Sequence, residues 1–288
     1  MDAATLLLVL VKASLITLMV GLGLGLDLGA FALFRHRPWL VLRVMLGTCV
    51  LVPLAALLVL QLPFSGQMSQ GARFGIALMA LSPSAPLTLR KAQLQGGDRH
   101  LAALLQVSAA LMAIISIPLL TDVFRAAYRI EGWDIGPKAV ALQVGMVQVL
   151  PLMVGLVLRR CFPLIASRWA QPIQKVAFLV NLVALGLILF KVSPKLLTFF
   201  QDNLTAIPVM GLMTAIALAI GYLLGGQGPG ERTTTALVTS MRNPGLALLF
   251  AITYGKEILG VKLAIVTYLL VRILCSMPFL RWSRRTDP

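Results

Sequence analysis

Long apolar stretches, separated by short polar segments, run along almost the whole chain. A helix needs about 20 apolar residues to cross the hydrocarbon core of a membrane. Stretches close to this length predict nine membrane-spanning helices, at residues 6–26, 40–62, 74–94, 101–123, 139–158, 176–190, 206–224, 233–254 and 261–280. The connections between them are short. We therefore expect an all-α polytopic membrane protein in which residues 1–288 form a single transmembrane domain.

Prolines interrupt the third and the eighth of these predicted helices, at residues 82–86 (SPSAP) and 242–245 (RNPG). In each, a proline is followed eleven residues later by a glycine: Pro86 by Gly97, and Pro244 by Gly255. Paired broken helices at matching places in two halves of a chain are typical of the binding sites of secondary transporters. Prolines are also common in membrane helices in general, but the matched position and spacing favour a functional role.

The two interruptions also predict an internal duplication. The broken helices are five apart in the predicted order, and an odd separation makes equivalent helices cross the membrane in opposite directions. We therefore expect an inverted-repeat transporter, with repeat one at about 4–124, a linking helix at about 138–160 and repeat two at about 173–281. Such repeats permit alternating access by rocking around a site at the membrane midplane.

The composition supports a membrane protein and orients it. Hydrophobic residues make up 59% of the chain, charged residues 12%, and the mean hydropathy is +0.91, which excludes a water-soluble globule. The net charge of +15 is dispersed among the loops rather than gathered in one patch, so no nucleic-acid partner is expected. Basic residues concentrate after the first, third, fifth and seventh predicted helices and in the C-terminal tail. The positive-inside rule then predicts a multi-pass protein of the cell (inner) membrane, with the N-terminus outside and the C-terminus in the cytoplasm.

The interruptions predict a site for an anion. Proline removes a backbone donor, and half-helix ends inside a membrane offer amides to anions and carbonyls to cations. Arg242 lies about midway along the eighth predicted helix and Arg272 about midway along the last, whereas no acidic residue lies deep in any of them. Because an unpaired charge there costs at least ~2.5 kcal/mol, a small organic anion is an attractive counterion.

The candidate site residues flank the two interruptions. The alternatives are that Arg90 and Arg272 extend to the membrane surface, that Arg242 is a structural cation on half-helix carbonyls, and that single hydroxyls only pack helices. Lys12, in the first predicted helix, has no assigned role. The substrate-binding candidates are Ser84, Thr88, Arg90, Thr239, Ser240, Arg242, Asn243 and Arg272, and the residues that keep the helices open are Pro83, Pro86, Pro244 and Gly245.

The remaining reactive residue types do not predict an enzyme. Cys49, Cys161 and Cys275 are scattered along the chain, and His36 and His100 have no nearby second ligand in the sequence. No poised acid, base, metal or nucleophile can be assembled from them. We expect no metal site, no cofactor and no catalytic activity.

The chain resembles the bile acid:sodium symporter family. The resemblance rests on residues 21–26 (GLGLGL), on residues 82–86 running into Gly97 and Asp98, and on residues 241–243 (MRN) before a small apolar helix. It implies a panel domain and a core domain with two crossing discontinuous helices. Members usually have ten helices, so the nine expected here resemble loss of the first.

The sodium ligands that the resemblance implies are mostly replaced. A Ser-Asn pair falls on Thr88 and Leu89, two hydroxyl ligands fall on Ala102 and Gln106, a glutamate falls on Val238 and a glutamine falls on Arg242, whereas the substrate-contacting asparagine is kept as Asn243. Monovalent cations need oxygen ligands, so sodium coupling at the usual sites is not expected. The hypothesis is that the guanidinium of Arg242 takes the electrostatic role of the lost sodium.

Together these observations predict a secondary transporter of an organic anion, bile-acid-like or a small carboxylate. It would work by alternating access, through proton symport, uniport or exchange. Three alternatives stay open: a sodium-coupled symporter with altered ligands, an auxin-efflux-type carrier, and a membrane sensor that binds the anion without transporting it.

Overall fold

The computed structural model describes residues 3–26, 28–85, 88–128, 136–255, 258 and 260–286. Within these residues every regular element is a helix. The first half holds α1 (Ala3–Gly25), α2 (Leu28–His36), α3 (Pro38–Leu46), the π-helix η1 (Gly47–Leu51), α4 (Val52–Gln61), the 3-10 helix η2 (Pro63–Gln67), α5 (Gln70–Leu81), α6 (Thr88–Leu94) and α7 (Arg99–Tyr128). The second half holds α8 (Pro137–Val144), the π-helix η3 (Gly145–Val149), α9 (Leu150–Cys161), α10 (Pro163–Asp202), α11 (Ala206–Leu223), α12 (Pro229–Ser240), α13 (Pro244–Tyr254) and α14 (Val261–Thr286).

The predicted fold class is confirmed. In the described part of the chain, eight segments are long and apolar enough to cross a membrane. The broken helix α12–α13 is one of them, because its two halves follow each other closely. The remaining predicted helix, at residues 74–94, is divided between α5 and α6, which are each too short to cross alone.

The apolar run at residues 176–190, which predicted one helix, is only part of a much longer helix in the structure. It is the middle of α10, which has 40 residues and is therefore about 60 Å long. Lys175 and Lys191 bound the apolar run, but lysine is a good helix former and does not end a helix. Hydropathy marks the part of a helix that suits a membrane, not the point where the helix ends.

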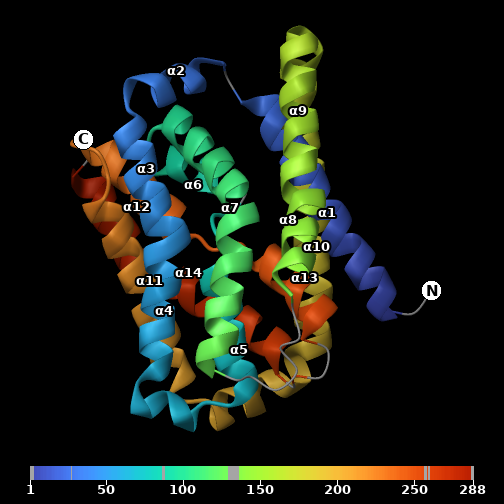
Figure 1. Cartoon of the computed structure of the whole chain (residues 1–288), viewed down its shortest axis with the longest axis vertical. Helices are drawn as coiled ribbons and strands as arrows, with labels where there is room; N and C mark the ends of the chain where they lie inside the picture. The colour runs from blue at the N-terminus through green and yellow to red at the C-terminus, as the bar shows by residue number, and fades with distance from the viewer. Residues whose placement is uncertain are drawn as a thin grey trace.

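The helices form two groups (Figure 1). The panel consists of α1, α9 and α10, which pack along one another. The bundle consists of α3 to α7 and α11 to α14, in which α11 packs against α12, α14 and α4, and α5 packs against α14. In the α12–α13 span 94% of the apolar window is buried inside the protein, against 17% in α10. The second broken helix is therefore central, and α10 is peripheral.

Glycines bring two panel helices into backbone contact. A Cβ atom on Gly23 of α1 would lie 2.5 Å from the carbonyl oxygen of Leu152, and one on Gly155 of α9 would collide with the carbonyl oxygen of Val20. Small residues permit this close approach between membrane helices. The glycine-rich run at residues 21–25 therefore serves helix packing.

The two broken helices run in opposite directions. In the bundle α5 packs against α13, and α6 packs against α12. Since the chain passes from α5 to α6 but from α12 to α13, the two must be antiparallel. The extent of the two proposed repeats stays a prediction.

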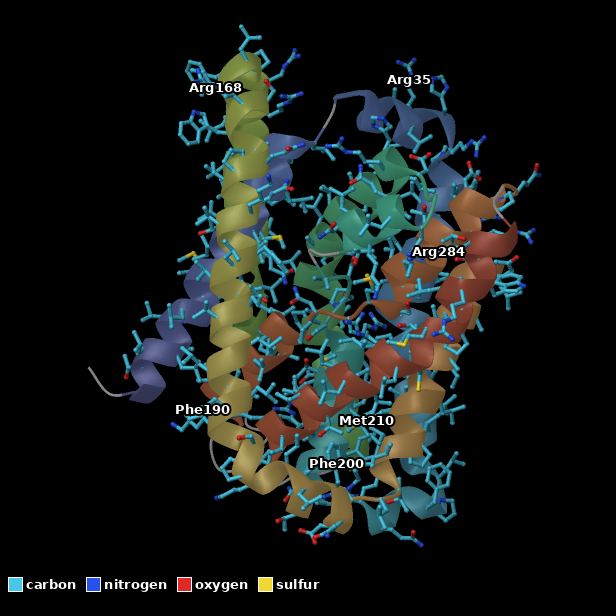
Figure 2. All side chains as sticks on the ribbon, turned by 180° about the vertical axis from the view of Figure 1, so that it is seen from behind. Arg35, Arg168, Phe190, Phe200, Met210 and Arg284 are labelled. Atoms are coloured by element: carbon cyan, nitrogen blue, oxygen red, sulfur yellow. The ribbon has the colours of Figure 1, made fainter. Side chains whose placement is uncertain are left out.

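Basic side chains gather at one end of the molecule, which we call the basic end. Arg35, Arg168 and Arg284 lie in the upper half of the molecule as drawn in Figure 2. The C-terminus and α2 lie at the same end (Figure 1).

Candidate functional site

The two broken helices meet at their interruptions and satisfy each other's backbone. The first interruption follows Leu81, where α5 ends, and the second occupies residues 241–243 between α12 and α13. The amide of Ala85 donates to the carbonyl oxygen of Met241 at 2.6 Å, and the amide of Asn243 donates to the carbonyl oxygen of Ser82 at 3.1 Å. Non-helical backbone at membrane depth needs such partners inside the protein. We call this contact the crossover.

At the first interruption the carbonyl oxygen of Ala85 accepts from the amide of Thr88 at 3.0 Å and from two side chains. The carbonyl oxygen of Ala85 accepts hydrogen bonds from Thr88 Oγ1 at 2.6 Å and from Gln106 Nε2 at 3.2 Å. Ser84 adopts a φ of +32°, which is unusual for a residue with a side chain, and its buried hydroxyl has no partner among the described residues. Strained backbone of this kind is concentrated at functional sites.

At the second interruption Asn243 starts α13. Its Oδ1 accepts a hydrogen bond from the amide of Leu246 at 3.1 Å, and Pro244 supplies the helical φ of the first turn. The Nδ2 atom of Asn243 is buried without a partner in the described structure. This interruption also touches the panel, because a Cβ on Gly245 would lie 3.1 Å from Leu15 and 3.4 Å from Asn181.

Arg242 points its side chain into the bundle and is only 1% exposed. Its Nη1 donates to the carbonyl oxygen of Thr48 in η1 at 2.9 Å. That carbonyl is available for a local reason: the amide of Val52 bonds five residues back to Gly47, and the next residue, Pro53, has no N–H to give to Thr48 in the same register. The hydroxyls of Thr48 and Thr239 are also bonded to each other, at 2.9 Å.

The opposite edge of the Arg242 guanidinium has no hydrogen-bond partner among the described residues. Its Nε and Nη2 atoms are buried and have no hydrogen-bond partner in the described residues. These two N–H groups point the same way and form the fork that binds a carboxylate through two parallel hydrogen bonds. One edge of Arg242 is thus fixed to protein, and within the described residues the other edge carries two unpaired donors.

A second buried guanidinium lies in α14, which packs against α13. Arg272 is 6% exposed, and its Nε has no partner within the described structure. Tyr268, one turn earlier in α14, interacts electrostatically with both Arg242 and Arg272. Lys91 of α6 is also within electrostatic range of Arg272.

The site has an excess of donors and of positive charge. In the described chain, the ion pairs are Arg37 with Glu231 and Arg125 with Asp122, so neither buried arginine pairs with a carboxylate there. Besides the groups already named, Thr267 Oγ1 and Gln106 Oε1 are buried without partners. Of these atoms only Gln106 Oε1 is purely an acceptor. An acceptor-rich anion matches this set.

Most of the predicted site residues lie at the crossover or beside it. Thr88, Thr239 and Ser240 are fully buried there, but their hydroxyls bond to neighbouring groups and hold the interruption in shape. Pro83 lies in the first interruption. Arg90 belongs to α6, and its side chain lies outside the described residues, as does Pro86 altogether.

Sequence reasoning missed Thr48 and Tyr268. The sequence held only a partial signal for Thr48: in an α-helix Pro53 would free the carbonyl of Cys49, and the π-helical register of η1 moves this effect to Thr48. Within the described residues no group of three or more His, Cys, Asp or Glu side chains can hold a metal ion.

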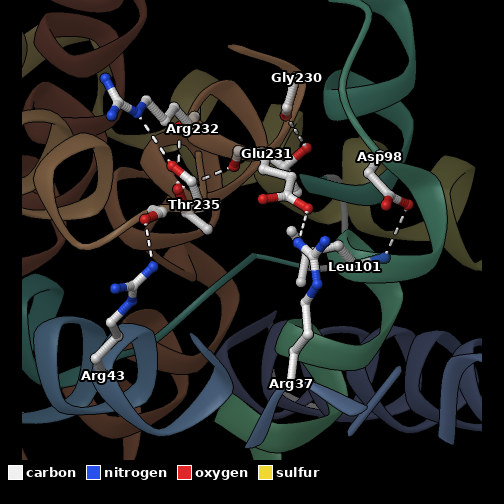
Figure 3. A network of polar contacts seen from close by, with 11 residues as sticks. Arg37, Arg43, Asp98, Leu101, Gly230, Glu231, Arg232 and Thr235 are labelled. Carbon is white, nitrogen blue, oxygen red and sulfur yellow. Dashed lines mark hydrogen bonds and ion pairs between the residues drawn. The ribbon is translucent and has the colours of Figure 1, made fainter. Parts of the chain in front are cut away.

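A second polar network lies at the basic end (Figure 3). Arg37 forms an ion pair with Glu231 at the start of α12, and Arg43 Nη2 donates to the carbonyl oxygen of Gly225 at 2.6 Å. Asp98 caps α7 by accepting from the amide of Leu101 at 3.0 Å. These side chains border a cavity of about 810 Å³, which is separate from the crossover residues.

The Arg37–Glu231 pair is expected to add little stability. The side chain of Arg37 is 53% exposed, and exposed ion pairs contribute about 0–1 kcal/mol. Arg37→Ala should lower the free energy of unfolding by no more than about 1 kcal/mol, measured by denaturant titration in detergent. Arg125→Ala, at the other exposed pair, is the matched control. A much larger loss for Arg37→Ala alone would show that this pair holds α12 in place.

Comparison with known proteins gives a consistent family. Residues 13–223 match the family described as the Sodium Bile acid symporter family. Over 249 residues the chain is 28% identical to Sodium/bile acid cotransporter 4 of Homo sapiens, and 27% identical to the proteins of the same name from Rattus norvegicus and Mus musculus. Each match covers 82% of this chain and 54% of the relative, so the chain spans about half the length of these curated relatives.

Proposed function

Because the chain belongs to the Sodium Bile acid symporter family, we propose that it is a secondary transporter that moves an organic anion across a membrane by alternating access. Its membership confirms the resemblance drawn from the residues at the two interruptions. One observation carries the proposal: both N–H groups of the carboxylate-binding fork of the buried Arg242 lack a partner among the described residues.

A bound anion would offset the cost of burying the charge of Arg242. A buried charge whose partner is missing costs about 3–5 kcal/mol relative to a paired one. In the described structure Arg242 has one hydrogen bond to protein and no carboxylate. A carboxylate on the fork would neutralise it and satisfy both orphan donors. We assign the fork of Arg242, Nδ2 of Asn243, the hydroxyl of Ser84 and Arg272 to the anion, and Thr88, Thr239 and Ser240 to the support of the crossover.

We further propose that sodium does not drive this transporter through the usual sites. Two carbonyls at or beside the crossover already have donors: that of Ala85 is filled by Thr88 and Gln106, and that of Thr48 by Arg242. Val238, Leu89 and Ala102 offer no side-chain oxygen to a cation. The fixed charge of Arg242 then takes the electrostatic role that a bound sodium would have.

The proposed orientation places the basic end in the cytoplasm of a cell (inner) membrane, following the positive-inside rule. Alternating access would come from motion of the panel against the bundle. The contact of Gly245 with Leu15 and Asn181 supports this, because there the crossover meets α1 and α10 directly.

Counterflow in proteoliposomes tests the proposal. Vesicles are loaded with unlabelled carboxylates, from small hydroxy acids to bile acids, and entry of the labelled compound is followed. We expect accumulation of at least one of them, with an initial rate that is unchanged when choline replaces sodium on both sides. Strong dependence on sodium would contradict our interpretation of Val238, Leu89 and Ala102. Saturable binding in detergent without flux would instead identify a sensor.

Proton coupling or exchange is distinguished in the same vesicles. An imposed pH gradient accelerates entry under proton symport, whereas internal substrate accelerates it under exchange. Obligate exchange allows no entry into vesicles without internal substrate, whereas a uniporter equilibrates the label in such vesicles and does not respond to the pH gradient.

A further inference from the structure

The bundle contains two buried guanidiniums, one at the crossover and one in α14. Arg242 is 1% exposed and Arg272 is 6% exposed, and each has an orphan N–H. They belong to different elements: Arg242 lies between α12 and α13, and Arg272 lies in α14. Lys91 adds a third positive charge close to Arg272. An anion with one charge leaves this site positive.

One carboxylate on the Arg242 fork cannot neutralise both guanidiniums, because it carries a single negative charge. A bidentate contact with Nε and Nη2 of Arg242 uses both oxygens of a carboxylate. Tyr268 is within electrostatic range of both Arg242 and Arg272, which belong to different elements. The Nε of Arg272 and the hydroxyl of Thr267, both on α14, then remain without acceptors. A second anionic group on the same molecule would supply them.

We infer that the substrate is a dianion, with one carboxylate on the fork of Arg242 and a second acidic group at Arg272. Small dicarboxylates have this chemistry, and so does a bile acid that carries an added sulfate. The inference rests on the proposed function, since it names the class of anion that the crossover takes. In the competing arrangement the substrate carries one negative charge and a separate inorganic anion, such as chloride, binds at Arg272.

Matched compounds test the number of charges at constant size. Glutarate, its monomethyl ester and valerate have the same acyl chain but carry two, one and one negative charges, and a bile acid is compared with its 3-sulfate. Succinate and adipate vary the separation of the two charges. Each competes against the labelled anion that gives the best counterflow, in chloride and in gluconate buffers.

The inference predicts that the best dianion competes at least about tenfold more strongly than its singly charged partner, because a hydrogen bond to a charged group is lost in the latter. Arg272→Gln should bring this ratio close to one, whereas Arg125→Gln, at an exposed arginine, should preserve it. Equal or stronger competition by the single charges, with or without chloride dependence, overturns the inference but leaves anion transport intact. Absence of counterflow by every compound, with protein that elutes as a single folded species, overturns the proposed function itself.

Discussion

Replacing Arg242 with glutamine is expected to weaken anion binding and uptake by about 10-fold to 100-fold. Glutamine offers at most one donor where the fork formed by Nε and Nη2 offers two, so about one hydrogen bond to a charged group is lost, which contributes about 1.5–3 kcal/mol. It also removes the charge that attracts the anion into the bundle. The measurement is the concentration dependence of counterflow for the wild-type protein and the variant, at equal amounts of reconstituted protein.

Two further measurements separate this role from a structural one. Arg242→Lys keeps the charge but loses the fork, so it should fall between the wild-type protein and Arg242→Gln. If Arg242 were only a structural cation, its removal would cost about 3–5 kcal/mol of stability. On our account the ligand-free glutamine variant loses less stability than this, because the removal of an uncompensated buried charge offsets the loss of the hydrogen bond to the Thr48 carbonyl. Unchanged uptake and affinity in the glutamine variant would refute the assignment of Arg242 to the anion.

Gly155→Ala is expected to be the most destabilising single methyl addition in the panel. Its Cβ would collide with the carbonyl oxygen of Val20, and backbone atoms cannot rotate away as a flexible side chain can. Overpacking of this kind costs about 1–3 kcal/mol. The helices α1 and α9 must separate, so the melting temperature of the purified protein should fall and the yield of folded protein should drop.

The chain offers a matched control for this change. Gly186 lies in α10, and a Cβ there meets no atom within 4 Å. Gly186→Ala should therefore be neutral or slightly stabilising, since alanine is favoured over glycine in a helix by about 0.5–1 kcal/mol. Equal melting temperatures for the two variants would contradict the close packing of α1 on α9.

The sequence predicted the crossover well because its signals are local. Proline interrupts a helix wherever it stands, so the breaks near Pro83 and Pro244 could be read from the chain, and their odd separation agrees with the antiparallel course of α5–α6 and α12–α13. The burial of Arg242 was also foreseeable, since it lies midway along an apolar run. The family followed from the same residues.

What the sequence could not supply were partners far apart along the chain. Thr48 lies 194 residues from Arg242, and only folding brings its carbonyl to the guanidinium. The place of Tyr268 beside both arginines likewise depends on how α14 packs against α11 and α5. The predicted ends of the helix at residues 176–190 were wrong for a different reason. Residues that favour a helix extend beyond the apolar run on both sides, so α10 continues past it.

The central claim is that an organic anion, not sodium, neutralises the crossover by sitting on the fork of Arg242. The most direct test is a crystal structure of the protein with a brominated analogue of the carboxylate that counterflow selects, in which the bromine is located by anomalous scattering. Our account predicts that the carboxylate lies within hydrogen-bond distance of Nε and Nη2 of Arg242 and of Nδ2 of Asn243. A carboxylate bound in the cavity at the basic end, with the fork of Arg242 still unoccupied, would contradict it.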